Sequence, residues 1–360
     1  MQAVVLVGGE GTRLRPLTLA TPKQMLPVAE QPMIERVLGQ LARHGVDEAV
    51  LSLGYLPDAF LRAYPDGVAA GVRLSYAVEP EPLDTAGAVR FAAVHAGIGD
   101  TFVVVNGDVL TDLDVGALVA FHRARRAEGT IALHPVADPS AFGVVPTDDE
   151  GRVTAFVEKP PPGEAPTNLI NAGTYVLEPS VLARIAPDRR VSIERETFPA
   201  MVVDGRLFAR ADDAYWLDTG TPAAYLQAQW DLLEGRRPGP PVPGARRVVD
   251  GYWVLGHPEV AGKVAGASLV ADGARVAAGA TVDRSVIGAG CVVEDGATVV
   301  ESALLAGSRV CAGASVVGSV LGAGAVVGAG ADVRPLSVLG FGAEVAPHDV
   351  VDGRRVPEPE

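Results

Sequence analysis

A glycine-rich loop near the N-terminus carries residues suited to holding phosphate. Residues 8–18 read GGEGTRLRPLT and follow an apolar run, Ala3 to Val7. Closely spaced glycines let backbone N–H groups converge on an anion, and Arg13 and Arg15 add charged forks that match phosphate geometry. Lys23 follows a few residues later. The Gly-Lys-Ser/Thr ending of a P-loop is missing and the spacing differs from the dinucleotide fingerprint, so an ATPase or a dehydrogenase loses its main support.

Two acidic residues stand where a divalent cation could be held. Asp108 ends the motif Asn106-Gly107-Asp108, directly after the apolar run Phe102 to Val105, and Asp218 lies shortly before a helix start. In open α/β sheets, ligands bind beyond the carboxyl ends of strands where the strand order reverses. If the strands of the two apolar runs are neighbours, the glycine loop and Asp108 face one crevice. An Asp there can hold Mg²⁺ while substrate phosphates supply other ligands; the alternative for each acid is a helix cap or a turn.

Rare residue types mark two further motifs. The chain has only three lysines and three asparagines, and basic residues are otherwise arginine. Lys159 falls in Glu158-Lys159-Pro160, at the end of an expected strand, and Asn171 begins Asn171-Ala172-Gly173. Since arginine replaces lysine nearly everywhere else, Lys23 and Lys159 mark places that need a compact ammonium group. The alternative for Glu158 and Lys159 is a solvated surface pair.

The overall composition narrows the class of protein. The chain has 360 residues, 48% of them hydrophobic, which is ample for two domains with buried cores. Its net charge of −14 argues against non-specific nucleic acid binding, so any phosphate must be held by a local cluster. The first apolar run is too short for a signal peptide or a membrane span. We therefore expect a cytoplasmic protein with no membrane or nucleic acid partner.

Up to about residue 234, short apolar runs alternate with helical patterns, which predicts a largely parallel sheet covered by helices. We expect strands at 3–7, 49–53, 74–77 and 102–105, hairpin-like strands at 131–135, 153–157 and 172–177, and helices at 34–41, 85–96, 115–127 and from 222. Residues 235–244 then read GRRPGPPVPG, a linker without periodicity. The predicted organisation is a catalytic domain at 1–234, a linker at 235–247 and a repeat domain at 248–354.

Aliphatic residues in the repeat domain recur at six-residue steps, often followed by Gly or Ala. The steps join Val264, Val270, Val276 and Val282, then Ile287, Val293, Val299, Leu305, Cys311 and Val317, then Leu321, Val327, Val333, Leu339 and Val345. This period predicts a parallel β-helix whose flat faces end in tight corners. Cys311 is accordingly expected to be buried as a small hydrophobe. The repeat resembles the hexapeptide repeat of left-handed β-helix proteins.

With these motifs laid out, residues 1 to about 234 resemble sugar-1-phosphate nucleotidyltransferases. The matching motifs occur in order: Gly8-Gly9-Glu10-Gly11-Thr12-Arg13-Leu14, Pro22-Lys23, Asn106-Gly107-Asp108, Phe142-Gly143-Val144-Val145, Glu158-Lys159-Pro160, Asn171-Ala172-Gly173 and Asp218. Thr85-Ala86-Gly87, Phe156 to Pro160 and Tyr215 to Gly220 most resemble mannose-1-phosphate guanylyltransferases that carry a C-terminal β-helix. The fold implied is a Rossmann-like mixed, mostly parallel sheet followed by the left-handed β-helix.

The resemblance also implies an activity and roles for residues. The expected reaction is Mg²⁺-dependent transfer of a nucleotidyl group from an NTP, GTP by the resemblance, to mannose 1-phosphate, giving GDP-mannose and pyrophosphate. The roles implied are nucleotide binding by Gly8, Gly9, Gly11, Thr12, Arg13, Thr85 and Gly87; catalysis by Arg13, Lys23, Asp108, Lys159 and Asp218; metal binding by Asp108 and Asp218; and sugar-phosphate binding by Gly143, Glu158, Lys159 and Asn171.

Two positions depart from the guanylyltransferase pattern and keep alternatives open. Asp84 stands where relatives usually have Gly, and Gln24 is more reminiscent of glucose-1-phosphate thymidylyltransferases. The alternatives are a thymidylyl- or uridylyltransferase acting on glucose 1-phosphate and, in another class, a catalytically silent regulatory subunit that binds sugar nucleotides. The β-helix itself could be an acyltransferase, but its two histidines, His257 and His348, lie at its edges. We expect instead a homo-oligomer assembled through the β-helix, which becomes smaller when residues after Gly235 are removed.

Overall fold

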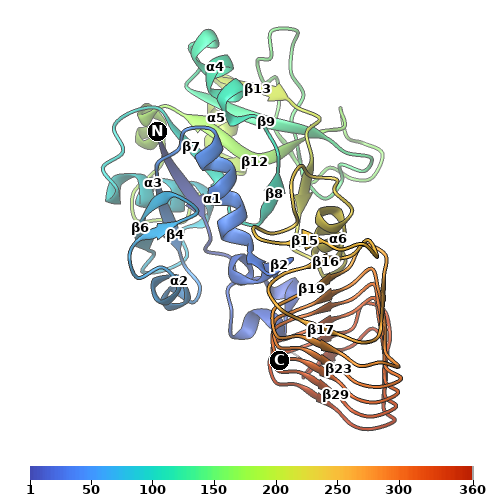
Figure 1. Cartoon of the computed structure of the whole chain (residues 1–360). Helices are drawn as coiled ribbons and strands as arrows, with labels where there is room; N and C mark the ends of the chain where they lie inside the picture. The colour runs from blue at the N-terminus through green and yellow to red at the C-terminus, as the bar shows by residue number, and fades with distance from the viewer. Residues whose placement is uncertain (359–360) are drawn as a thin grey trace. The chain divides into compact units, whose positions relative to one another are not determined.

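A computed structural model describes residues 1–358, which form two compact units (Figure 1). Met1–Gly9 and Ile34–Trp216 form the first, here called the sheet unit. Glu10–Met33 and the chain from Leu217 onward form the second, here called the β-helix unit. The units therefore interleave along the chain. The boundaries predicted for three consecutive domains stay a prediction.

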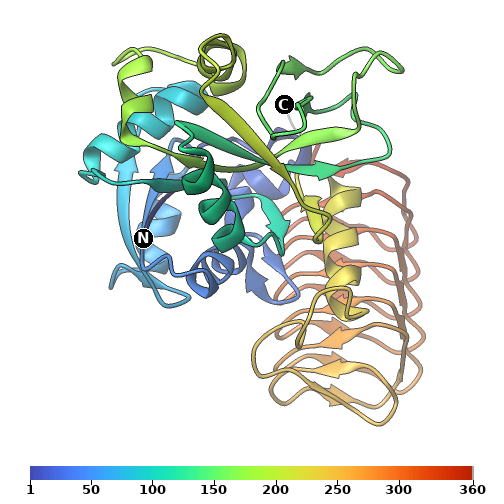
Figure 2. The same ribbon diagram turned by 90° about the horizontal axis from the view of Figure 1, so that it is seen from above.

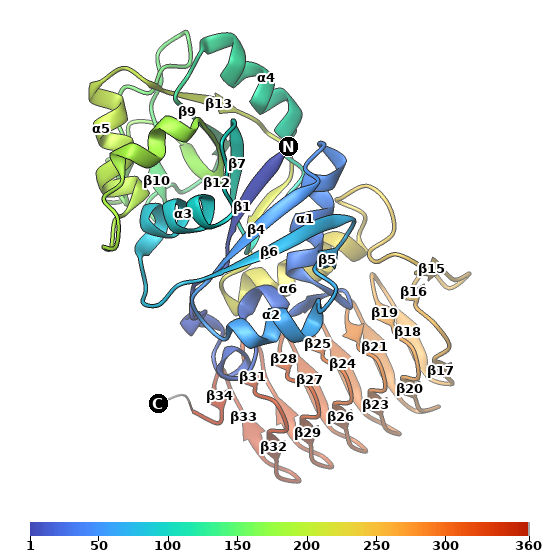
Figure 3. The same cartoon turned by 90° about the vertical axis from the view of Figure 1, so that its left-hand side faces the viewer.

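The sheet unit is built on a mixed sheet with the order β11-β10-β12-β7-β1-β4-β6-β5 (Figure 3). Its centre, β7-β1-β4-β6, is parallel, and the strands at both edges join it antiparallel. Its strands are β1 (Gln2–Leu6), β4 (Glu48–Leu53), β5 (Val68–Ala69), β6 (Val72–Val78), β7 (Phe102–Asn106), β9 (Gly129–Pro135), β10 (Gly143–Val144), β11 (Val157–Glu158), β12 (Leu169–Leu177) and β13 (Leu207–Ala211). β1 pairs in parallel with both β4 and β7, which confirms that the first and fourth expected strands are neighbours. The strand order reverses between them, at the place where open sheets bind ligands.

Helices cover both faces of this sheet because successive side chains of a strand point to opposite faces. They are α1 (Met33–Arg43), α2 (Pro57–Ala63), α3 (Asp84–His95), α4 (Val115–Arg125) and α5 (Phe198–Val203). Val89 of α3 shares a buried cluster with Val4 and Val104. Leu41 of α1 and the neighbouring strand residue Val105 line one small cavity, on the opposite face. The predicted helices at 34–41, 85–96 and 115–127 are confirmed to within a turn.

The hairpin-like region is only partly as predicted. β9 and β12 are strands and pair antiparallel with each other. The strand expected over 153–157 is wrong: Val153 forms an isolated bridge to Thr147, and only Val157 and Glu158 enter the sheet, as β11. In this stretch the pairing partner changes within a few residues, so apolar side chains are buried without a continuous strand. A run of apolar residues looks the same in the sequence whether it forms a continuous strand or only such short pairings.

The repeat domain is a parallel β-helix whose three sheets are described within residues 246–358. The first holds β16 (Trp253–Val254), β19 (Leu269–Val270), β22 (Val286–Ile287), β25 (Ala303–Leu304), β28 (Val320–Leu321), β31 (Val338–Leu339) and β34 (Arg355–Val356), with β15 (Arg246–Arg247) antiparallel at its edge. The second holds β17 (Glu259–Val260), β20 (Arg275–Val276), β23 (Val292–Val293), β26 (Arg309–Val310), β29 (Val326–Val327) and β32 (Glu344–Val345). The third holds β18 (Lys263–Ala265), β21 (Thr281–Asp283), β24 (Thr298–Val300), β27 (Ser315–Val317), β30 (Asp332–Val333) and β33 (Val350–Val351).

The stacking corrects one part of the predicted repeat. Four buried serines stand one coil apart, at intervals of 17 residues: Ser268, Ser285, Ser302 and Ser319. The hydroxyl of each of the first three accepts a hydrogen bond from the N–H of the next; the Ser302 N–H, for example, donates to Ser285 Oγ at 3.1 Å. Coils that repeat after 17 residues therefore take steps of six, six and five, whereas the coil from Leu321 to Leu339 takes 18 residues. Most predicted positions point inward, but Leu305, Cys311 and Val317 are one residue out of register, and Leu304, Val310 and Val316 fill the core instead. Because side chains alternate between faces, this slip leaves Cys311 partly exposed, not buried.

The last helix of the expected catalytic domain lies along the β-helix. α6 (Pro222–Leu233) begins at Thr221, whose side chain accepts the N–H of Ala224, and runs beside the coils in Figure 2. The Arg284 guanidinium lies 4.3 Å from the centre of the Trp230 ring, which attaches the helix to the second complete coil. Among residues 1–358, none of the helices has the length and apolar character needed to cross a membrane.

Candidate active site

Gly11 turns the glycine-rich loop back on itself within the β-helix unit. Its φ of 63° is in the left-handed region that favours glycine, and a Cβ there would lie 2.9 Å from Thr18 Cγ2 and 3.2 Å from Lys23 Cβ. The Thr18 hydroxyl donates to the Gly11 carbonyl at 2.8 Å. The loop is thus folded onto the segment that carries Lys23, while Thr12 and Arg13 stay exposed.

Arg13 and Asp218 meet in the same unit. Arg13 Nη2 lies 3.7 Å from Asp218 Oδ2, and Asp218 Oδ1 accepts the Gly220 N–H at 2.8 Å. A Cβ at Gly220 would lie 2.5 Å from Arg13 Nη2, so the absence of a side chain leaves the space that the guanidinium occupies. The Arg13 side chain is 60% exposed, so the ion pair adds little stability and leaves the guanidinium open to a ligand.

Gly8 and Gly9 belong to the sheet unit, where they follow β1. A Cβ at Gly8 would lie 3.4 Å from Glu79 Oε1, so this carboxylate stands beside the end of the strand. Glu79 accepts hydrogen bonds from the Ser52 hydroxyl at 2.9 Å and from the Leu83 N–H at 3.1 Å. Sequence reasoning missed Glu79, although it directly follows β6 and the strand-end rule that selected Asp108 also selects it.

Asp108 lies just beyond β7, as predicted. The Gly107 N–H donates to the Leu6 carbonyl at 2.9 Å, which ties the Asn106-Gly107-Asp108 turn to the end of β1. Asp108 is half-buried. The sheet unit therefore places Asp108 beside the strand that leads into Gly8, at the edge where the strand order reverses.

The Asn171-Ala172-Gly173 motif is a bulge in β12 beside β7. The pairing of β12 with β9 shifts register between Asn171 and Tyr175, and Gly173 takes a φ of 71°. A Cβ at Gly173 would lie 2.6 Å from Asn106 Nδ2, so only glycine fits against that side chain. Asn171 Nδ2 donates to the Tyr175 hydroxyl at 2.9 Å. Burial raises the pKa of Tyr175, so its hydroxyl stays neutral and holds Asn171 in place.

Gly143, Glu158 and Lys159 form one group at the edge of the sheet. Gly143 pairs with Glu158 in the β10–β11 ladder, and a Cβ on it would lie 2.7 Å from the Phe156 ring and 3.0 Å from Glu158 Oε2. The Lys159 N–H donates to the Phe142 carbonyl at 3.0 Å, and its Nζ lies 3.7 Å from Glu158 Oε1. The Lys159 side chain is 62% exposed. Its ammonium group is thus accessible to a phosphate.

Thr85 and Gly87 have structural partners at the start of α3. The Thr85 hydroxyl donates to Glu194 at 2.7 Å and accepts the Ile193 N–H at 2.8 Å. A Cβ at Gly87 would lie 3.0 Å from the Arg189 carbonyl. Both positions thus pack against residues 189–194, and their expected place near a base stays a prediction. Asp84 has a φ of 61°, and its carboxylate accepts a hydrogen bond from the Thr85 N–H at 2.8 Å.

Phe142 and Trp216 lie in motifs quoted from the sequence, but sequence reasoning did not predict that they form an aromatic cluster with His134. The His134 and Trp216 rings stack with centroids 5.5 Å apart, and Phe142 meets Trp216 edge-on at 5.6 Å. The Trp216 indole N–H donates to the Ala172 carbonyl at 2.9 Å. The cluster therefore connects the bulge at Asn171 with His134 of β9 and with Phe142, the residue before β10. His134 lies in a plain apolar strand pattern, so its sequence position carries no signal.

The sequence predicts that Asp108 and Asp218 hold a metal ion. No group of three or more His, Cys, Asp or Glu able to hold a metal ion exists in the described chain, residues 1–358. Mg²⁺ commonly binds through one or two carboxylates, with substrate phosphates and water completing its shell. That Asp108 and Asp218 hold a cation in this way stays a prediction.

Comparisons with known proteins show the family to which the chain belongs. Residues 2–235 match the nucleotidyl transferase family, and residues 264–359 match the GMPPB C-terminal domain. The chain is 42% identical over 302 residues to mannose-1-phosphate guanylyltransferase of Mycobacterium tuberculosis, covering 79% of this chain and 83% of that one. It is 44% identical over 230 residues to mannose-1-phosphate guanyltransferase of Schizosaccharomyces pombe, covering 63% of this chain and 62% of that one.

Solved structures match the nucleotidyltransferase part. HddC from Yersinia pseudotuberculosis, solved in complex with GMP-PN, is 29% identical with a TM-score of 0.55, covering 63% of this chain and 97% of that one. A putative glucose-1-phosphate thymidylyltransferase from Bacillus anthracis, 24% identical with a TM-score of 0.57, covers 64% of this chain and 94% of that one and shares the fold. The chain belongs to the nucleotidyl transferase family, among the mannose-1-phosphate guanylyltransferases.

Proposed function

We propose that this chain transfers a guanylyl group from GTP to mannose 1-phosphate and releases GDP-mannose and pyrophosphate. The observation that carries the proposal is the 42% identity to a mannose-1-phosphate guanylyltransferase that this chain matches along 83% of that protein's length. The match thus extends beyond the nucleotidyl transferase region of residues 2–235.

The reaction needs little proton chemistry. A phosphate oxygen of mannose 1-phosphate attacks the α-phosphorus of GTP, the bond to the β-phosphate oxygen breaks, and pyrophosphate leaves with that oxygen. The attacking oxygen is already ionised near pH 7, so no general base is required. Catalysis is then positioning together with neutralisation of the charge on the phosphates.

The chain's own residues divide this work. Arg13 and Lys23 of the folded-back loop would neutralise the triphosphate, with Arg13 on the departing pyrophosphate. Lys159 would hold the sugar phosphate, because its exposed ammonium group lies at the edge of the sheet beside Glu158. Gly143, Glu158 and Asn171 would line the sugar pocket, and Thr85 and Gly87 would approach the base. The Debye length of about 8 Å lets this local positive charge act despite the net negative charge.

Family members generally use a divalent cation, and Mg²⁺ is proposed for this chain. When bound, it would lower the negative charge on the phosphates during attack. Asp108 and Asp218 are the residues that would hold it, as the sequence motifs imply.

One substrate panel tests the proposal. The purified full chain is assayed for pyrophosphate release with four NTPs against the 1-phosphates of mannose, glucose and N-acetylglucosamine, in Mg²⁺. Fastest release with GTP and mannose 1-phosphate supports the proposal. Preference for dTTP or UTP with glucose 1-phosphate would make it a thymidylyl- or uridylyltransferase, and no release with any pair would favour a silent regulatory subunit.

The proposal extends to assembly and location. We expect a homo-oligomer formed through the β-helix, and a cytoplasmic location, where nucleoside triphosphates are made. We expect no consumption of acetyl-CoA with sugar phosphates, because His257 and His348 lie at the ends of the β-helix; steady release of CoA would contradict this.

A further inference from the structure

The segment Glu10–Met33, which carries Arg13 and Lys23, is packed with the β-helix and α6 in one compact unit. The hydrogen bonds to those partners described below join residues 200 to 342 positions apart along the chain. The bonds that fix the segment lie at its two ends, where the loop meets the last coil and where a short hairpin meets an inner coil. Each end is tied by polar contacts with main-chain atoms.

The first end is held by the terminal coil of the β-helix. Arg355 Nη2 donates to the Arg13 carbonyl at 3.3 Å. A Cβ at Gly340 would lie 3.1 Å from Pro16 Cγ, so the coil's backbone presses directly on the loop. Gly340 itself bonds to the Val356 carbonyl at 2.7 Å, within the β31–β34 pairing. The carbonyl of the proposed pyrophosphate ligand is thus bonded by a side chain from the far end of the protein.

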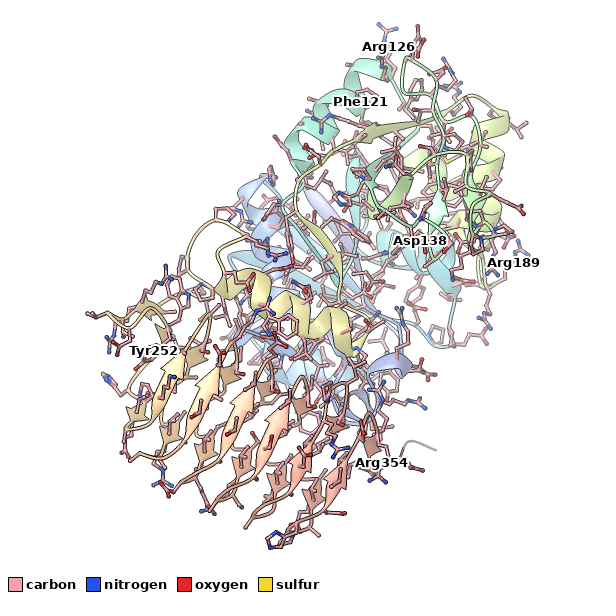
Figure 4. All side chains as sticks on the ribbon, turned by 90° about the vertical axis from the view of Figure 1, so that its right-hand side faces the viewer. Phe121, Arg126, Asp138, Arg189, Tyr252 and Arg354 are labelled. Atoms are coloured by element: carbon pink, nitrogen blue, oxygen red, sulfur yellow. The ribbon has the colours of Figure 1, made fainter. Side chains whose placement is uncertain are left out.

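Arg355 lacks one hydrogen bond that a residue serving only to stabilise the fold would be expected to make. Its Nη1 is buried and has no hydrogen-bond partner, and burial lowers its pKa. A buried guanidinium nitrogen without a partner is costly. By contrast its neighbour Arg354, labelled in Figure 4, is exposed and donates to the Val350 carbonyl at 2.8 Å, within its own coil. The two adjacent arginines therefore differ in whether they reach the loop.

The second end is a hairpin formed by β2 (Pro27–Val28) and β3 (Gln31–Pro32). Its turn residues Ala29 and Glu30 have φ of 46° and 69°, a conformation that costs non-glycine residues energy unless their surroundings hold it. The Ala29 N–H donates to Gln229 Oε1 of α6 at 2.6 Å, and Glu30 Oε2 accepts the Ala289 N–H of the β-helix at 3.0 Å. These bonds hold the turn in place.

We propose that the β-helix is the support of the triphosphate loop, with Arg355 and Glu30 acting as positioning residues for Arg13 and Lys23. This inference rests on the proposed function. Gly11, two residues before Arg13, packs against Lys23. A shift of either attached end would therefore move both Arg13 and Lys23. The repeat domain is then part of the catalytic apparatus, and not an assembly surface alone.

The matched pair Arg355→Met and Arg354→Met in the full chain tests this. We expect Arg355→Met to raise the KM for GTP about tenfold, the effect of losing a hydrogen bond from a charged group, while the KM for mannose 1-phosphate and the thermal midpoint stay near those of the parent chain. Arg354→Met should leave all of these values unchanged. Equal kinetics of Arg355→Met and the parent chain, or equal losses toward both substrates, would overturn the inference.

Hydrogen exchange provides a readout that does not depend on turnover. Peptides covering residues 10–26 should take up deuterium faster in Arg355→Met than in Arg354→Met, in the absence of substrate. Glu30→Ala should do the same for residues 25–33, and Glu30→Gln, which keeps an oxygen acceptor for the Ala289 N–H, should restore slow exchange. Unchanged exchange in both Arg355→Met and Glu30→Ala would refute the positioning role.

The two failures can be told apart. If the parent chain turns over none of the NTP and sugar phosphate pairs, the proposed function has failed, and the exchange measurements still decide whether the β-helix holds the loop. If the parent chain is active and the variants match it in kinetics and exchange, this inference alone has failed.

Discussion

Adding a single methyl group at Gly220 should disable the site without unfolding the protein. An alanine Cβ there would lie 2.5 Å from Arg13 Nη2 and 2.9 Å from Asp218 Oδ1, against the 3.4 Å at which ordinary contact begins. The atoms in the way are the ends of two side chains, so they, and not the backbone, must move. The Arg13 guanidinium must retreat by about 1 Å, a displacement that costs an active site on the order of a hundredfold in rate.

We therefore expect Gly220→Ala to lower kcat/KM for GTP about a hundredfold, measured by pyrophosphate release. The free energy of unfolding, measured in urea, should change by less than about 1 kcal/mol, because the new methyl displaces only side-chain ends. The control is Gly99→Ala, since a Cβ at Gly99 meets nothing within 4 Å and that residue is exposed.

A double-mutant cycle identifies the cause. If the loss acts through Arg13, then Gly220→Ala should have almost no further effect in a chain that already carries Arg13→Ala. Additive losses in the cycle would show that the methyl group acts elsewhere. Near-normal activity of Gly220→Ala alone would refute the claim that the Arg13 position matters.

Other predictions concern single residues and the whole chain. Asp108→Asn should lower the rate on the order of a hundredfold by pyrophosphate release, since it removes a proposed metal ligand; near-normal activity would exclude Asp108 from the mechanism. Lys159→Met should raise the KM for mannose 1-phosphate much more than that for GTP. Burial lowers the pKa of His122 in the folded state, against a raising effect of its bond to Glu178. Stability from His122 is thus complete above its unfolded pKa near 6.5 and is lost as pH falls, so unfolding free energies of the parent chain and His122→Gln should converge between pH 7.5 and 5. Light scattering of the full chain should give more than the mass of one chain; a monomer would contradict assembly through the β-helix.

Local patterns predicted much of the sheet unit because they depend on near neighbours. The apolar runs of β1 and β7 marked buried parallel strands, and the rule on strand ends then led to Asp108. The same rule applies to Glu79, which directly follows β6. The sequence did not fix the end of that strand, so nothing distinguished Glu79 from the other acidic residues nearby. Thr85 shows the reverse case: its motif is recognisable, whereas its bonds to Ile193 and Glu194 depend on a segment far along the chain.

The repeat was predictable in kind but not in every register. Where two adjacent residues are both apolar, as in Leu304-Leu305 and Val310-Cys311, the pattern cannot say which one points inward, and a step of five is read as six. The attachment of Glu30 to Ala289 was also beyond sequence reasoning, because a single glutamate in a loop has no periodicity that names a partner 259 residues away.

The contact between Arg13 and Arg355 also bears on how the repeat domain comes apart. A solenoid is held coil to coil, so unravelling begins at an end. Here Arg13 and Pro16 contact the last coil from outside the stack, at Arg355 and Gly340. Coupling free energies are reciprocal. A nucleotide that stabilises the contact between Arg13 and the last coil must therefore also stabilise that coil against unfolding. A cell short of the triphosphate would then hold chains that fray first at their C-terminal end, linking the survival of the enzyme to the supply of its own substrate.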